Sequence, residues 1–181
     1  MQFHKTPLQD CLLIIPEVFK DHRGVFLESY HKRKFFEATG LEIEFVQDNQ
    51  SVSKRGVLRG LHFQMGEFAQ AKLVQVIYGE VMDVVVDLRP DSPTFKKTHK
   101  IILNDQNHHQ LYIPQGFAHG FITLSETSVF SYKCDRFYSP GTESGVLYND
   151  PDLAIDWNFP EEDLILSEKD TKLPLLKELF K

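Results

Sequence analysis

The sequence predicts an all-β domain, built as an antiparallel sandwich or barrel with short helices at its periphery. Three observations support this class: short strand-like runs fill the middle of the chain, turn-forming clusters separate them, and helical patterns occur only near the ends. The chain has 181 residues, which suits a single domain because domains average about 150 residues. We therefore treat residues 1–181 as one domain.

Seven central runs have the composition of strands. Ala71–Tyr78 and Val81–Leu88 flank a Gly-Glu turn, and we expect them to pair as a hairpin around it. The other five runs are Val57–Gln64, His99–Leu103, Gln110–Ile113, His119–Leu124 and Ser128–Lys133.

The two ends of the chain carry the remaining patterns. Arg23–Glu28 alternates between polar and apolar residues and predicts an early strand. His31–Thr39 predicts a short helix that ends at Gly40, since glycine suits the left-handed conformation of a helix C-terminus. Leu173–Phe180 predicts a second helix with Pro174 in its first turn.

The composition argues against several classes of protein. Lys and Arg number 20 and Asp and Glu number 26, so the net charge is 20 − 26 = −6, which disfavours nucleic acid and anionic membrane surfaces as partners. The longest apolar run, Cys11–Pro16, is far shorter than the ~20 residues of a membrane span. The first residues lack the apolar core of a secretory signal. Two cysteines, Cys11 and Cys134, provide neither a disulfide framework nor a cysteine zinc site, so we expect reduced thiols in a cytoplasmic protein.

A histidine in the first central strand is a candidate for proton transfer. Strand alternation places Gly60, His62 and Gln64 on one face, and Leu61 and Phe63 on the other. If the first face lines a barrel, His62 lies in the interior beside Gln64. The alternative is a hydrogen-bonded histidine of the core or rim with no chemical role.

Three cations lie in or beside predicted strands with apolar neighbours: Arg23, Arg59 and Lys72. A cation that points into a barrel must be paired or must bind an anion. A histidine with Lys and Arg nearby suits proton abstraction next to a carbonyl on a phosphorylated substrate.

Two further residues have both a chemical and a structural interpretation. Tyr132 shares a strand face with Phe130 and is either an acid or a packed tyrosine with a satisfied hydroxyl. Asp170 either orients a histidine or is a helix cap or surface charge.

The segment Pro114–His119 resembles the second motif of the cupins, whose histidine often binds a metal together with a first-motif His-x-His pair. Here Gln64 stands where that pair needs its second histidine. Because transition metals favour clusters of imidazoles, the sequence predicts no metal site at His62 and His119.

Read together, the segments of this chain are similar to the dTDP-4-dehydrorhamnose 3,5-epimerase family of metal-free cupin enzymes. The resemblance rests on residues 19–28, 45–49, 56–64, 71–74, 114–121, 149–151 and 166–170. It implies a cupin-type antiparallel jelly-roll barrel with short peripheral helices and no cofactor.

The resemblance also implies roles for individual residues. His62 would be the base that removes the C3 and C5 protons, Asp170 would polarise it, Tyr132 would be the acid on the opposite face, and Lys72 would stabilise the enolate. The implied substrate-binding residues are Arg59 and His119 at the diphosphate, Gln47, Asn49, Glu143 and Lys169 along the rest of the nucleotide sugar, and Arg23 and Glu28 from a neighbouring subunit. The chain departs from the family at Gln50, where members often have histidine.

The implied activity converts dTDP-4-dehydro-6-deoxy-D-glucose to dTDP-4-dehydro-L-rhamnose, for dTDP-L-rhamnose synthesis. The implied partners are this dTDP-linked sugar and a second copy of the chain, with segment 1–45 at the dimer interface and segment 160–181 peripheral. Three alternatives stay open: an enzyme that epimerises C3 or C5 alone, a ketoisomerase of a related 4-keto sugar nucleotide, and a sugar-nucleotide-binding cupin without turnover.

Overall fold

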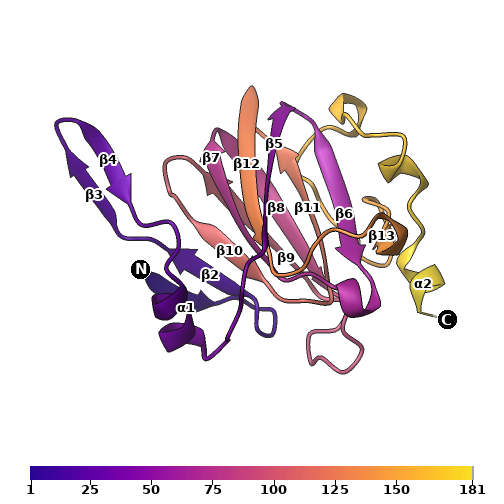
Figure 1. Ribbon diagram of the computed structural model, residues 1–181. Helices are drawn as coiled ribbons and strands as arrows, with labels where there is room; N and C mark the ends of the chain where they lie inside the picture. Colours follow the sequence, from indigo (N-terminus) through magenta and orange to yellow (C-terminus); the bar gives the residue numbers. More distant parts are fainter. Residues whose placement is uncertain (181) are drawn as a thin grey trace.

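The computed structural model describes residues 1–180 and is built mainly from two antiparallel sheets that enclose a barrel-like core (Figure 1). The six-stranded sheet runs in the order β1 (Gln2–Lys5), β2 (Leu12–Ile15), β10 (Gln110–Ile113), β7 (Lys72–Tyr78), β12 (Thr127–Cys134) and β5 (Gln47–Lys54). The five-stranded sheet runs in the order β13 (Glu143–Gly145), β6 (Leu58–Gln64), β11 (Phe117–Thr123), β8 (Glu80–Asp87) and β9 (Thr98–Asn104). The predicted all-β, antiparallel class is confirmed.

The predicted hairpin between Ala71–Tyr78 and Val81–Leu88 is wrong. β7 and β8 do follow one another through Gly79, but they belong to different sheets: β7 pairs with β10 and β12, whereas β8 pairs with β11 and β9. Gly79 has a φ of 79° and donates its N–H to Asp105 Oδ2, 2.7 Å away. This turn passes the chain from one sheet to the other instead of folding it back on the same sheet.

Two further strands form a separate hairpin, β3 (Val18–Asp21) and β4 (Gly24–Leu27), which projects away from the barrel at the left of Figure 1. The strand predicted at Arg23–Glu28 is β4. The apolar side chains of the hairpin are largely exposed: Phe19 on β3 is 53% and Phe26 on β4 69% exposed.

The helices are short. α1 (Lys32–Thr39) begins where the His31 side chain accepts the Lys34 N–H and ends at Gly40, whose φ is 70°, as the sequence predicts. The predicted helix at Leu173–Phe180 is too long, because α2 covers only Leu176–Leu179. The Pro174 carbonyl accepts the Leu147 N–H, which keeps the chain extended up to α2. Within residues 1–180 no helix is long and apolar enough to cross a membrane.

Both faces of the five-stranded sheet are buried. One face meets the six-stranded sheet in the barrel interior, and the other packs against the C-terminal part of the chain through Trp157 and Leu176. This explains why three consecutive valines, Val84–Val86, are all fully buried. This packing holds the C-terminal part of the chain against the five-stranded sheet, so that η4 (Asp170–Lys172) contacts β6.

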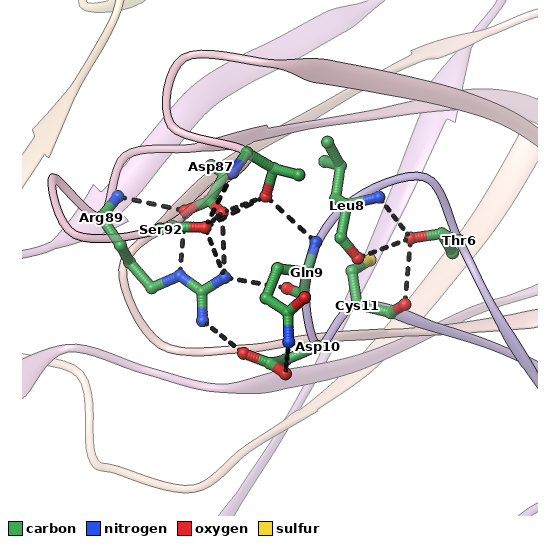
Figure 2. Close-up of polar contacts among 9 residues, drawn as sticks. Thr6, Leu8, Gln9, Asp10, Cys11, Asp87, Arg89 and Ser92 are labelled. Carbon is green, nitrogen blue, oxygen red and sulfur yellow. Dashed lines mark hydrogen bonds and ion pairs between the residues drawn. The ribbon is translucent and has the colours of Figure 1, made fainter.

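An ion-pair network around the buried Asp87 joins the β1–β2 loop to the loop after β8 (Figure 2). The carboxylate of Asp87 accepts hydrogen bonds from Arg89, from Ser92 (2.5 Å) and from Thr94 (2.6 Å), and Arg89 also donates to Asp10. Burial acts to raise the pKa of Asp87, but these hydrogen bonds outweigh it and lower the pKa to about 2.

We expect Asp87→Asn to lower the free energy of unfolding at pH 7 by roughly 2–4 kcal/mol, because it leaves Arg89 without its buried partner. Since the folded pKa lies below the unfolded value, the carboxylate stabilises the fold above about pH 4, and this contribution disappears as the pH falls toward about 2. Urea unfolding should therefore show a difference between wild type and variant that shrinks below pH 4. The exposed Asp91 of the same loop supplies the control, Asp91→Asn. A difference that is constant from pH 6 to 3 contradicts the assignment.

Candidate active site

One cavity of about 520 Å³ lies between the two sheets, within the usual size range of small-molecule sites. Side chains from both sheets and from the segment before η4 line it. Gln50, where the chain departs from the family, lines this cavity. Seven of the predicted catalytic and substrate-binding residues also meet here: Arg59, His62, Lys72, His119, Tyr132, Lys169 and Asp170.

The first pair in the cavity is His62 on β6 and Asp170 at the start of η4. His62 Nε2 lies 2.5 Å from Asp170 Oδ1, although 108 residues separate the two in sequence. Burial acts to raise the pKa of Asp170, but the hydrogen bond and the charge of His62 outweigh it, so the pKa falls below its usual value. An ionised carboxylate that accepts the Nε2 proton leaves Nδ1 as the ring nitrogen that can take up another proton.

Arg59 and His62 line the same cavity, although strict alternation would turn them to opposite faces of β6. The register against β11 shifts between them: His62 lies opposite His119, whereas Arg59 lies opposite Phe121. Residues 60–61 of β6 therefore oppose one residue of β11, which is a β-bulge. The bulge turns both side chains toward the cavity, and the simple alternation predicted for this strand does not hold through it.

Glycine is required at the bulge for steric reasons. Gly60 has a φ of 117°, and a Cβ atom there would lie 2.6 Å from the Gly120 Cα. The close approach of β6 and β11 thus depends on two residues without side chains.

Lys72 on β7 and Tyr132 on β12 occupy the opposite wall, where the Lys72 Nζ lies 5.8 Å from the centre of the Tyr132 ring. Tyr132 shares the barrel face with Phe130, as predicted. Burial lowers the pKa of Lys72 below its usual value, although the carboxylates of Asp83 and Glu143 oppose this shift. Burial also raises the pKa of Tyr132, so its phenol is protonated at neutral pH.

Gln47, Asn49 and Glu143, which were predicted to bind substrate, do not line the cavity. They belong to a polar network beside it, which Lys169 joins from the cavity wall. Glu143 Oε2 accepts hydrogen bonds from Tyr138 Oη and from Lys169 Nζ, each at 2.5 Å. Burial acts to raise the pKa of Glu143, but these two partners outweigh it and lower the pKa. Gln47 accepts the Tyr138 N–H and donates to Asn49, which lies across from Tyr132 in the sheet.

The predicted residues Arg23 and Glu28 lie away from the cavity of their own chain. Arg23 is in the turn of the β3–β4 hairpin and pairs with Asp21, and Glu28 follows the hairpin and pairs with Lys34 at 2.8 Å. Neither residue lines the cavity described above.

The two cavity histidines do not share a set of metal ligands. His62 pairs with Asp170 and His119 with Asp83, and within residues 1–180 no three His, Cys, Asp or Glu side chains are grouped so as to hold a metal ion. Gln64 does not stand beside His62 in the cavity. Its Oε1 instead accepts the backbone N–H of Ser139, 2.8 Å away, and so holds the loop after β12.

Sequence and structure comparisons now identify the family. The family model described as dTDP-4-dehydrorhamnose 3,5-epimerase matches residues 5–178. The chain is 51% identical to the dTDP-4-dehydrorhamnose 3,5-epimerase of Salmonella typhimurium, over 95% of this chain and 93% of that protein. The chain belongs to the dTDP-4-dehydrorhamnose 3,5-epimerase family.

Solved structures of dTDP-4-dehydrorhamnose 3,5-epimerases confirm the cupin-type fold. The crystal structure of the enzyme from Elizabethkingia anophelis superposes with a TM-score of 0.95 at 57% identity, covering 98% of this chain and 97% of that one. The dTDP-6-deoxy-D-glucose-3,5-epimerase of Legionella pneumophila, solved in complex with dTDP-4-keto-L-rhamnose, superposes with a TM-score of 0.94 at 44% identity, covering 99% of this chain and 94% of that one. A relative from Streptomyces niveus, 44% identical over 98% of this chain and 85% of its own length, is a dTDP-4-dehydrorhamnose 3-epimerase.

Asp83 and Ser51 are among the polar residues at this epimerase-family site that the sequence analysis missed. Asp83 on β8 is fully buried and bonds to His119, and Ser51 on β5 lines the cavity with a buried hydroxyl that has no partner within residues 1–180. A signal for Asp83 was present: strand alternation places it on the same face as Val81 and Val85, which fill the barrel. Nothing in the polar sequence around Ser51 distinguishes it from a surface loop.

Proposed function

We propose that this protein epimerises C3 and C5 of dTDP-4-dehydro-6-deoxy-D-glucose and releases dTDP-4-dehydro-L-rhamnose for dTDP-L-rhamnose synthesis. The observation that carries the proposal is the arrangement of two residue pairs around one cavity. His62 and Asp170 lie on β6 and η4, whereas Lys72 and Tyr132 lie on β7 and β12 of the other sheet. The family assignment supports the same reaction. The nucleotide-sugar substrate of the proposed reaction and the two buried free thiols of the protein favour the cytoplasm as the place of action.

His62 is the base of the proposed reaction. The C4 ketone acidifies the C–H groups at C3 and C5, and the free Nδ1 of His62 takes one of these protons. The C–H electron pair becomes the C=C bond of an enolate, and the carbonyl oxygen acquires the negative charge. Asp170 stabilises the imidazolium that forms, since its carboxylate stays ionised beside the ring.

Lys72 and Tyr132 complete the step. The Lys72 ammonium stabilises the enolate oxygen, and a preorganised group of this kind contributes about 3–4 kcal/mol. Tyr132 returns a proton to carbon from the face opposite His62, which inverts the centre. Burial lowers the Lys72 pKa because it disfavours the charged form, so an anion beside the buried ammonium offsets that cost. Burial also raises the Tyr132 pKa, which keeps the phenol protonated.

The rest of the site binds the nucleotide diphosphate. Arg59 and His119 contact the diphosphate in this proposal, and the polar network of Gln47, Asn49, Glu143 and Lys169 contacts the remainder. The net charge of −6 makes local cations such as Arg59 and Lys169 necessary, because the molecule as a whole repels an anionic substrate.

Arg23 and Glu28 act in the site of a second copy of the chain. The support is the hairpin that projects from the barrel (Figure 1), because its Phe19, Val25 and Phe26 side chains stay exposed within residues 1–180. A homodimer in which each hairpin closes the neighbouring cavity would bury this surface and complete both sites.

Subunit mixing tests the shared site. His62→Ala and Arg23→Ala chains should each be poorly active, but a mixture should recover about a quarter of wild-type activity, since half of the dimers are hybrids and half of their sites are intact. Mixing His62→Ala with Tyr132→Phe is the control, because both changes lie in the barrel and no hybrid site is then intact. No recovery after proven exchange of subunits contradicts the shared site.

Proton exchange in deuterium oxide tests the reaction itself. With dTDP-4-dehydro-6-deoxy-D-glucose and protein that has been dialysed against a chelator, we expect deuterium at both C3 and C5 and the appearance of the L-rhamnose configuration. Deuterium at one carbon only identifies a mono-epimerase, the activity of the Streptomyces niveus relative. No exchange at either carbon contradicts the proposal, and activity that returns only with added metal contradicts its metal-free chemistry.

A further inference from the structure

Asp83 is a buried carboxylate beside the cavity, and the proposed reaction gives it no role. Asp83 on β8 is 0% exposed and faces the barrel interior between Val81 and Val85. Its Oδ2 lies 2.8 Å from His119 Nε2, and its Oδ1 has no hydrogen-bond partner within residues 1–180.

Fold stability does not explain this residue. A carboxylate with one unpartnered oxygen in an apolar interior is costly to bury, and apolar side chains of similar volume often stabilise a core at least as well as a buried ion pair. Buried polar groups that are only half satisfied call for another explanation.

The charge of Asp83 also acts on the groups packed around it. Burial lowers the pKa of Lys72 on β7 and of His99 on β9, and the charge of Asp83 opposes both shifts. Burial raises the pKa of Cys11 to about 12, and Asp83 adds to that rise. Of the titratable groups that face it, His119 on β11 is the one to which Asp83 is hydrogen-bonded.

The ring of His119 is held from two sides. The Asp83 carboxylate is hydrogen-bonded to Nε2, and the ring stacks on Phe130 with centroids 5.9 Å apart and planes at 28°. His119 lines the cavity and is only 7% exposed. Its Nδ1 has no protein partner among the described residues.

We propose that Asp83 is a positioning residue for His119. It accepts the Nε2–H, fixes this tautomer in the free protein, and leaves Nδ1 facing the substrate. Because an unprotonated Nδ1 can only accept a hydrogen bond, Nδ1 takes up a proton from solvent when the anionic diphosphate binds and donates it to a diphosphate oxygen. This inference deepens the proposed function, since the contact between His119 and the substrate diphosphate rests on it. The tautomer itself is a property of the free protein.

The first test is therefore made without substrate, by ¹⁵N NMR of histidine-labelled protein, with the His119 signals assigned by their loss in His119→Gln. We expect a protonated Nε2 in the wild type and a shift toward protonated Nδ1 in Asp83→Asn, whose amide can donate to Nε2. The Asp91→Asn control should leave the signals unchanged. A wild-type His119 whose only ring proton is on Nδ1 overturns the proposal even if the Asp83 variant does not fold.

The second test is a double-mutant cycle on kcat/KM. Asp83→Asn should lower kcat/KM about 10–100-fold. In the His119→Asn background it should have an effect of less than about twofold, whereas in the Lys72→Met background it should keep its full effect. An equal loss with and without His119 overturns the proposal, because Asp83 then acts through the fold or through Lys72. Failure of the wild type to turn over the sugar contradicts the proposed function, and the NMR result still decides the role of Asp83.

Discussion

His62→Asn is expected to lower kcat/KM by at least about a thousandfold and to abolish deuterium uptake at both C3 and C5. General-base catalysis by a histidine contributes about 10²–10⁴-fold, and here the same base serves both carbons. Asparagine is close to histidine in shape but has no nitrogen that takes up a proton. The measurement is NMR of the sugar nucleotide in deuterium oxide, followed over hours.

The control for this variant is His4→Asn, which changes an exposed histidine of β1 and should leave the rate unchanged. Circular dichroism of both variants checks the fold. Exchange at C3 and C5 at close to the wild-type rate in His62→Asn would show that another group is the base.

Tyr132→Phe is expected to separate proton exchange from inversion. The base remains, so C3 and C5 should still exchange with solvent, but the proton returns from the face of His62 and the configuration is retained. Because a general acid contributes about 10²-fold or more, formation of the L-rhamnose configuration should fall by at least that factor. Proton coupling constants distinguish the retained from the inverted product.

Tyr78→Phe is the matched control, because Tyr78 ends the neighbouring strand β7 and is 60% exposed. Normal inversion at both carbons in Tyr132→Phe would mean that water or another residue supplies the proton on that face. The two variants together assign each proton transfer to one side of the cavity.

The central strands with a buried face could be predicted from the sequence, whereas the polar edge strand β5 and the short strands β1, β2, β3 and β13 were missed. The run of valines in β8 and the segment Gln110–Ile113 appear in the structure close to their predicted bounds. β5 has the sequence QDNQSVSK and went unrecognised, because it lies at the edge of its sheet and alternates between exposed and partly buried polar residues. Local composition carries no signal for a strand whose pairing comes from β12 alone.

Residues close in sequence could be grouped, but their spatial partners could not be read from the pattern. His62 and Tyr132 each stood out through strand alternation, and both line the cavity. The pairing of His62 with Asp170 spans 108 residues, and before the structure only the family resemblance pointed to it. No spacing rule connects a β-strand histidine with an aspartate in a distant 3₁₀ turn.

The sequence by itself determined the all-β class, most strands, the helix ended by Gly40, and the set of polar residues available for chemistry. It did so because hydrophobic periodicity and turn residues are local properties of the chain. The tertiary structure decided that β7 and β8 join different sheets, that a bulge turns Arg59 toward the same cavity as His62, and that Asp83 stands behind His119. These features depend on which strands pair and in what register, and register is set by the packing of the whole barrel.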